Sequence, residues 1–166
     1  MRASSRYPRA VANAQPILVA IDFSVHSEAA LLWAAQTAQS FDAPLLVLHV
    51  IHDPEAAPGY YAHADASGYV RGMEEVAKQM LADFMERFRK ENPTLAPLAD
   101  ARTELVAGLP ATRILEVAEN EDARLIVMGS QGRTGLRHLL LGSKAERVAQ
   151  LSTRPVTIVK APAEPE

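Results

Sequence analysis

The stretch Pro44-Leu45-Leu46-Val47-Leu48-His49-Val50 decides the fold class of this chain. Its apolar residues follow one another without alternating with polar ones. A strand of this kind is buried on both of its faces, which is typical of a parallel sheet that is covered by helices on both sides. The stretch therefore predicts an α/β protein.

Similar short apolar runs recur on both sides of this stretch. The further predicted strands are 16–21, 103–107, 124–128 and 155–160, and helical patterns between them cover about 27–40, 69–90, 111–120 and 143–151. Five strands that alternate with helices predict a single-domain, open, five-stranded parallel sheet with helices on both faces, doubly wound through right-handed crossovers. The segment 52–68, rich in Pro, Gly, Ala and Asp, is predicted to be a surface loop.

Several side chains indicate where the helices begin and end. Ser27 is expected to cap the first helix, and Pro110 suits the first turn of the third. Pro93 and Pro97 are expected to stop the long second helix, because proline cannot continue a helical hydrogen-bond ladder. The apolar face of that helix is predicted from residues at helical spacing, namely Met73, Val76, Ala77, Met80, Phe84 and Phe88.

The composition narrows the range of functions. The chain has 166 residues and a net charge of −3, and it contains no cysteine, which excludes disulfides, thiolate metal sites and cysteine nucleophiles. Basic residues are scattered, so nucleic acid is not an expected partner. No apolar run is long enough for a membrane span, so no membrane partner is expected and a cytoplasmic location is predicted. Residues 1–15 are predicted to be a disordered tail, 16–160 the domain, and 161–166 a C-terminal tail.

A glycine-serine loop after the fourth predicted strand carries the chemistry. Gly129-Ser130-Gln131-Gly132 follows the strand, and Gly142-Ser143-Lys144 opens the last helix. Glycines let backbone N–H groups approach an anion closely, and a helix N-terminus favours negative charge. In α/β proteins, ligands bind at the carboxyl ends of the strands. The loop is therefore a candidate phosphate-binding site.

A purely structural explanation of the same residues stays open at this point. Ser143 and Glu146 have the spacing of a capping box, and glycines often form turns where a strand ends. The loop is not a Walker A motif, because Ser143 precedes Lys144, and it is not the dinucleotide-binding fingerprint.

The loop nevertheless resembles that of a known family. Gly129-x2-Gly132-x9-Gly142-Ser143, directly after Leu125-Ile126-Val127-Met128, resembles the ATP-binding signature of the universal stress protein family. The resemblance extends to three predicted strands, at Val19-Ala20-Ile21-Asp22-Phe23-Ser24, Leu48-His49-Val50 and Arg154-Pro155-Val156-Thr157-Ile158-Val159, and covers about residues 16–160. It implies a Rossmann-like fold of the adenine nucleotide alpha hydrolase type.

The resemblance also implies roles for individual residues. Asp22 is expected to accept hydrogen bonds from ribose hydroxyls, although an acid there can equally serve the helix dipole. The backbone of Val50 is expected to hold the adenine edge, and its side chain can belong to the core at the same time. The remaining expected ligands of the ribose and phosphates are Met128, Gly129, Gly132, Arg133, Gly142, Ser143 and Lys144. Met128 can equally be core filler, and Arg133 and Lys144 solvated surface cations.

The expected function is that of an ATP-binding stress-response regulator with at most slow hydrolysis. No catalytic residue and no protein metal site are predicted, and Mg²⁺ or Mn²⁺ is expected to be held mainly by the phosphates. The alternatives are a dimeric interaction module that does not bind nucleotide, and a true ATPase or nucleotidyl transferase. The partners expected are ATP, an unidentified regulatory protein, and a second copy of the chain that pairs along the edge of the last strand.

Overall fold

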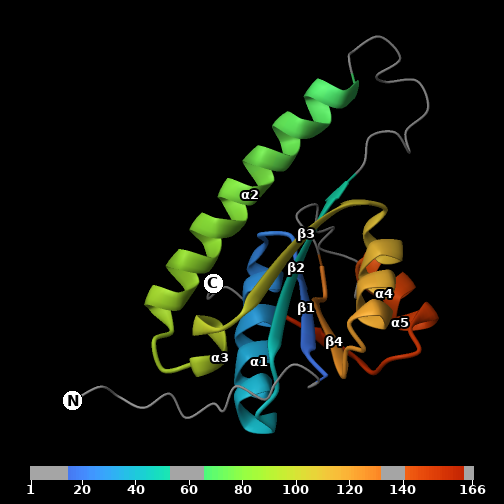
Figure 1. Cartoon of the computed structure of the whole chain (residues 1–166). Coiled ribbons are helices and arrows are strands. Elements are labelled where there is room, and N and C mark those ends of the chain that lie inside the picture. The colour runs from blue at the N-terminus through green and yellow to red at the C-terminus, as the bar shows by residue number, and fades with distance from the viewer. Residues whose placement is uncertain (1–14, 53–65, 132–140, 163–166) are drawn as a thin grey trace.

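The computed structural model describes residues 15–52, 66–131 and 141–162, so most of both predicted tails lies outside the described residues. One five-stranded parallel sheet has the order β3-β2-β1-β4-β5 (Figure 1). Its strands are β1 (Ile17–Ile21), β2 (Leu45–His52), β3 (Arg102–Gly108), β4 (Leu125–Gly129) and β5 (Val156–Val159). The prediction of a five-stranded parallel sheet is confirmed, and β3 and β5 form its two edges.

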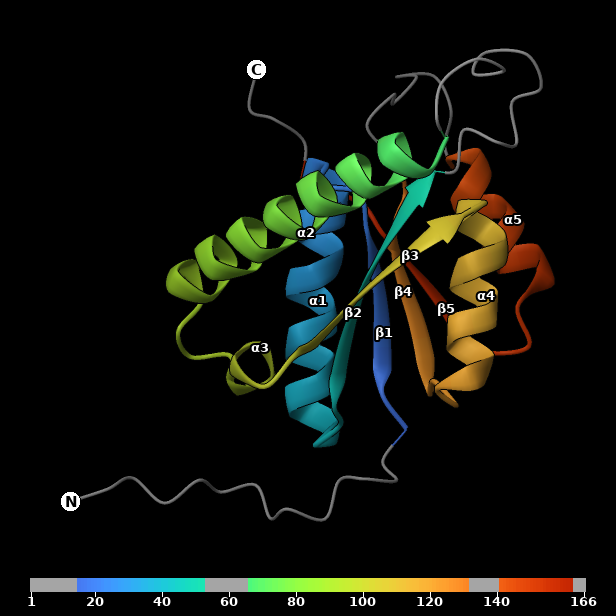
Figure 2. The same cartoon turned by 45° about the horizontal axis from the view of Figure 1, so that its top comes forward.

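Helices cover both faces of this sheet, as predicted (Figure 2). One face carries α1 (Val25–Phe41), α2 (Ala66–Glu91) and the short α3 (Ala96–Ala99), and the other carries α4 (Pro110–Asn120) and α5 (Ser143–Leu151). Each face has its own buried cluster. Val19 lies in the first, against α1 and α2, and its neighbour Leu18 lies in the second, against α4 and α5, because side chains alternate along a strand.

Two details differ from the sequence predictions. The N-cap of α1 is Ser24 and not Ser27, since the Ser24 side chain accepts a hydrogen bond from the Ser27 N–H. The chain turns at Phe23, which leaves Ser24 extended and places Ser27 inside the first turn. The helix α3 was not predicted. It has a proline at its start, where a missing N–H costs nothing.

The long helix α2 packs only part of its predicted apolar face. Ala77, Phe84 and Phe88 are buried, whereas Val76 and Met80 are 60% and 41% exposed. In Figure 1 the N-terminal end of α2 projects beyond the sheet, so its first turns have no strand beneath them.

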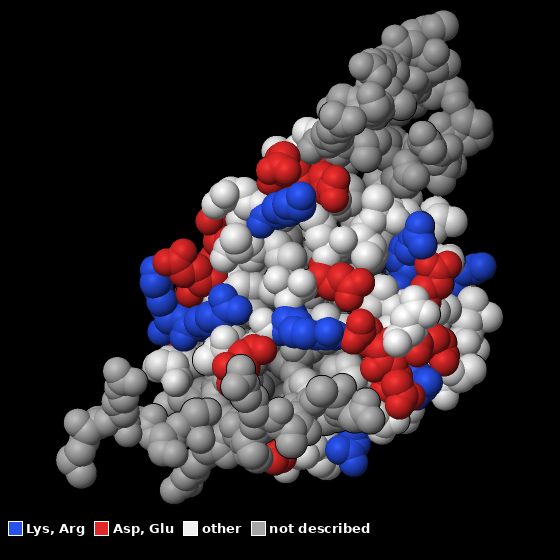
Figure 3. Space-filling model, viewed as in Figure 1, with Lys and Arg blue, Asp and Glu red and all other residues white. Residues whose placement is uncertain are grey.

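On the face viewed in Figure 3, acidic and basic side chains are intermixed. None of the helices in the described ranges is long and apolar enough to cross a bilayer.

Candidate functional site

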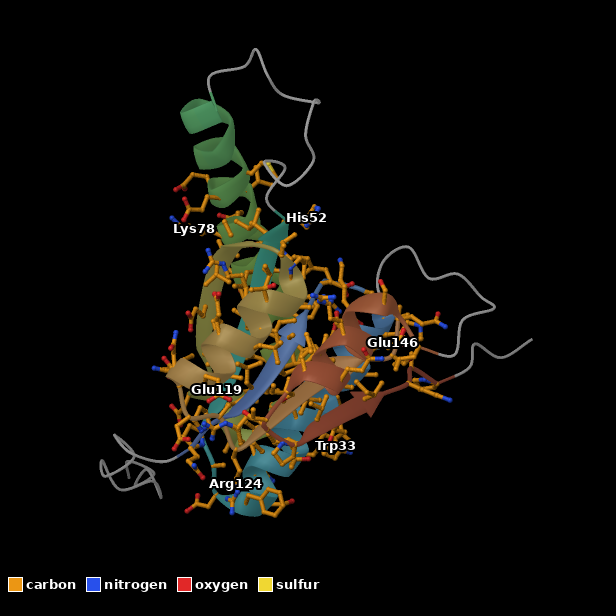
Figure 4. All side chains as sticks on the ribbon, turned by 90° about the vertical axis from the view of Figure 1, so that its right-hand side faces the viewer. Trp33, His52, Lys78, Glu119, Arg124 and Glu146 are labelled. Carbon is orange, nitrogen blue, oxygen red and sulfur yellow. The ribbon has the colours of Figure 1, made fainter. Side chains whose placement is uncertain are left out.

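The strand order reverses between β1 and β4, and the predicted site residues gather at the carboxyl end of this pair. Asp22 follows β1 directly, Gly129 ends β4, and Ser130 follows it. The register pairs Ala20 with Met128 and Ile21 with His49, so Asp22 is level with Ser130 on one side and with Val50 on the other. Such a reversal opens a crevice in which α/β proteins bind ligands. In Figure 4 the label of His52 marks the carboxyl ends of the strands, and Glu119 and Arg124 lie at their amino ends.

Asp22 is held by the residue that caps α1. Its Oδ1 accepts hydrogen bonds from the Ser24 N–H at 3.1 Å and from the Ser24 hydroxyl at 2.6 Å. The same hydroxyl accepts the Ser27 N–H at 3.2 Å, so a chain of hydrogen bonds runs from the first turn of α1 to the carboxylate. Asp22 is thus joined to the start of α1 through the N-cap residue Ser24. This arrangement also places the carboxylate at the carboxyl end of β1, beside the crevice.

Two backbone hydrogen bonds close the glycine-serine loop at its base. The Ser130 N–H donates to the Val159 carbonyl at 2.8 Å, and the Gly142 N–H donates to the Ser130 carbonyl at 2.7 Å. The start of α5 is therefore fixed beside the end of β4, as a phosphate loop requires. The Gly142 N–H itself is bonded to Ser130, which differs from the expectation that this group would meet a phosphate.

The first residue of α5 is not a side-chain cap. Gly142 takes the N-cap position, with φ −71° and ψ 145°, and no side chain caps the helix. Ser143 is the first helical residue and is exposed, so the capping-box explanation of Ser143 and Glu146 is wrong. By helix geometry the N–H groups of Ser143, Lys144 and Ala145 have no acceptor within the helix. These N–H groups suit an anion, and the exposed Lys144 side chain adds a positive charge beside them.

Gly129 is required for a different reason from the one predicted. Among the described glycines only Gly108 has a positive φ, so neither Gly129 nor Gly142 uses the left-handed region. A Cβ on Gly129 would lie 2.8 Å from the backbone carbonyl carbon of His26 and 2.9 Å from its oxygen. The glycine therefore lets the first turn of α1 approach β4.

His26 is the site residue that sequence reasoning missed. Its Nδ1 accepts the Ala161 N–H at 3.1 Å and lies 3.5 Å from the Ser130 Oγ. One side chain thus links α1, the start of the loop and the segment after β5. No sequence motif marks it, because its partners are 104 and 135 residues away along the chain.

The other predicted residues divide into two groups. Met128 is buried and Val50 half-buried, both against the α4 and α5 face, so their side chains serve the core. Gly132 and Arg133 lie outside the described residues. Within the described ranges, no group of three or more His, Asp or Glu side chains could hold a metal ion.

The sequence of the chain is similar to proteins of one known family. The model of the universal stress protein family matches residues 13–160. A universal stress protein of Methanocaldococcus jannaschii is 34% identical over 146 residues, covering 88% of this chain and 82% of the relative. Universal stress protein YxiE of Bacillus subtilis is 34% identical over 153 residues, covering 87% and 97%.

Solved structures show the same fold. Universal stress protein UspA of Lactobacillus plantarum superposes with a TM-score of 0.68 at 26% identity over 89% of this chain and 99% of that one. A universal stress protein of Archaeoglobus fulgidus in complex with dAMP has a TM-score of 0.60 at 28% identity, over 88% and 98%. A universal stress protein in complex with cAMP has a TM-score of 0.57 at 25% identity, over 90% and 98%. This chain belongs to the universal stress protein family.

Proposed function

We propose that this chain binds adenine nucleotides, ATP above all, in the crevice between β1 and β4, and that it acts as a nucleotide-dependent regulator in the stress response. The observation that carries the proposal is the Ser130–Gly142 hydrogen bond of 2.7 Å. It fixes the N-terminus of α5 beside the switch point, with Asp22 at the end of the neighbouring strand. The complexes of relatives with dAMP and cAMP support an adenine nucleotide as ligand.

Each part of the nucleotide is assigned to a group of the chain. Asp22 accepts the ribose hydroxyls, the backbone at Val50 meets the adenine, and the N–H groups of Ser143 and Lys144 meet the phosphates. Arg133 and Gly132 are proposed to complete the phosphate site, with Gly129 and Met128 beneath the nucleotide. Mg²⁺ or Mn²⁺ would be held by phosphate and water oxygens, as is usual for magnesium on nucleotides. Turnover would be slow, because the described part of the site presents no group placed to orient an attacking water.

Calorimetric titration of ATP into two variants of one residue tests the phosphate site. Ser143→Pro removes a single N–H at the first helical position, where proline is tolerated, and the ψ of 145° at Gly142 suits a following proline. Ser143→Ala keeps that N–H and removes only the hydroxyl. We expect the proline variant to bind ATP roughly tenfold more weakly or worse, a loss that corresponds to one charge-assisted hydrogen bond. Equal affinity of both variants and the wild type would contradict the phosphate assignment.

A homodimer through β5 is part of the same proposal. Among the described strands β5 pairs with β4 alone, and all four residues of β5 are only half-buried. The carbonyls of Pro155 and Val159 bond to β4, so by alternation the N–H of Ile158 points to the open edge. Ile158→Pro should therefore give a monomer by light scattering and still bind ATP. A wild type that is monomeric at micromolar concentration would contradict the dimer.

A further inference from the structure

Phe23 has a backbone conformation that its side chain disfavours. Its φ is +65°, in the left-handed region, where a bulky residue is a genuine outlier. Such a conformation persists only where the surrounding structure enforces it, and strained residues of this kind cluster at functional sites. Phe23 lies directly between Asp22 and Ser24, at the switch point of the sheet.

Two rings from other elements hold Phe23. Its ring centroid lies 4.5 Å from that of His49 on β2 and 5.4 Å from that of Phe84 on α2, the second contact being edge-to-face. Phe84 in turn stacks on Phe88, with centroids 5.9 Å apart. Aromatic pairs at these separations are attractive beyond the area that they bury. We call Phe23, His49 and Phe84 the aromatic clamp.

His49 also holds the residue on the other side of Asp22. Its Nδ1 lies 2.8 Å from the Ile21 carbonyl oxygen. A carbonyl can only accept, so Nδ1 carries a proton and donates it there. His49 thus contacts both neighbours of Asp22. It hydrogen-bonds to the backbone carbonyl of Ile21 and packs against the ring of Phe23.

We propose that Phe23 is a positioning residue that directs the Asp22 carboxylate at the ribose and so sets the preference for ribonucleotides. The left-handed turn brings the N–H and the hydroxyl of Ser24 to Asp22 Oδ1, which fixes the carboxylate at the crevice. A right-handed or extended Phe23 would send the chain elsewhere and remove both donors. This proposal rests on the proposed nucleotide site, and it adds that the aromatic clamp keeps that site preorganised.

The test compares the affinities of ATP and 2′,3′-dideoxy-ATP by calorimetry. We expect the wild type to prefer ATP by roughly 10- to 100-fold, the range for hydrogen bonds to a charged group. Asp22→Ala should abolish that ratio. Phe23→Gly should lower it about tenfold, because glycine adopts the turn without strain but lacks the ring that selects it. Phe23→Tyr, which keeps the ring, should retain the ratio.

The outcomes separate this proposal from the one on which it rests. Equal weakening of both nucleotides in Phe23→Gly, beside a collapsed ratio in Asp22→Ala, overturns the positioning role and leaves the nucleotide site intact. No binding to the wild type overturns both. If circular dichroism shows that Phe23→Gly is unfolded, Phe84→Leu decides, since it removes one ring contact and leaves the β1–α1 turn unchanged in sequence. A lower ratio in that variant supports the role, and an unchanged ratio contradicts it.

Discussion

At the carboxyl end of β4 the backbone of α1 approaches too closely for any side chain on Gly129. The atoms that an added Cβ would meet are the His26 carbonyl carbon, its oxygen and its Cβ, all between 2.8 and 2.9 Å away. Two of the three belong to the backbone of a helix and cannot rotate aside. Relief would have to come from a shift of α1 relative to the sheet.

Gly129→Ala is therefore expected to destabilise the fold. The free energy of unfolding should fall by about 1–3 kcal/mol, the usual cost of overpacking. Urea denaturation of the unliganded protein measures it. The matched control is Gly72→Ala, because Gly72 is exposed on α2 with nothing within 4 Å of an added Cβ. That change should stabilise the protein by about 0.5–1 kcal/mol, since alanine favours the helix. A harmless Gly129→Ala would show that α1 yields easily.

At the scale of the secondary-structure elements, the start of α1 depends on Ser24, which was not predicted to be the N-cap. Ser24→Ala should lower the free energy of unfolding by about 1 kcal/mol, the typical cost of losing an N-cap. Ser27→Ala should cost less. The Ser27 hydroxyl donates to the Ser24 carbonyl, which also accepts the Glu28 N–H and so stays bonded in the variant. Chemical denaturation of both variants measures the difference. A larger loss of unfolding free energy for Ser27→Ala than for Ser24→Ala would contradict the observed N-cap.

At the scale of the whole molecule, a cluster of ion pairs joins segments that are distant in sequence, at the amino ends of the strands. Arg154, just before β5, contacts Glu119 at the end of α4 at 3.1 Å and Asp122 in the following turn at 2.6 Å. Gln15 donates to Asp122, and the Thr153 hydroxyl to Glu119. The cluster connects the start of the domain with residues more than 100 positions later.

This cluster should make stability depend on pH. Hydrogen bonds from Arg154 and then Thr153 lower the pKa of Glu119, and those from Gln15 and then Arg154 lower the pKa of Asp122. A carboxyl group with a lowered pKa in the folded state binds fewer protons there than in the unfolded state. Its stabilising effect is therefore present above the ordinary values of 4.5 and 3.8 and is lost as the pH falls through the lowered ones.

Arg154→Met is expected to reduce stability at pH 7 and to converge with the wild type at the acidic end of the range. Urea denaturation from pH 3 to pH 7 measures the difference between the two proteins. Lys78→Met is the control, because the described contact of Lys78 is a 3.4 Å pair with Glu75 on the same helix, which joins no distant segments. An Arg154→Met deficit that stays constant over the whole range would show that packing, and not charge, accounts for the loss.

Much of the architecture follows from the sequence alone. Unbroken apolar runs such as Leu45–Leu48 require burial on both faces, and that requirement by itself selects a parallel sheet with helices on either side. Helical periodicity and Pro110 placed the helices to within a few residues. The loop proposed to bind phosphate was identified because Gly129 directly follows a buried strand. All of these signals are local in sequence, so they can be interpreted without knowing which distant residues are in contact.

Contacts between distant residues decided the rest. Gly129 is needed because α1 packs against it, and Phe23 is held in its turn by rings from β2 and α2. The N-cap of α1 is Ser24 and not the predicted Ser27, because the turn at Phe23 determines where the helix begins. His26 gained its role from partners more than 100 residues away. Such contacts depend on which strand lies beside which, and only the tertiary structure determines that order, because spacing along the chain carries no information about distance across the sheet.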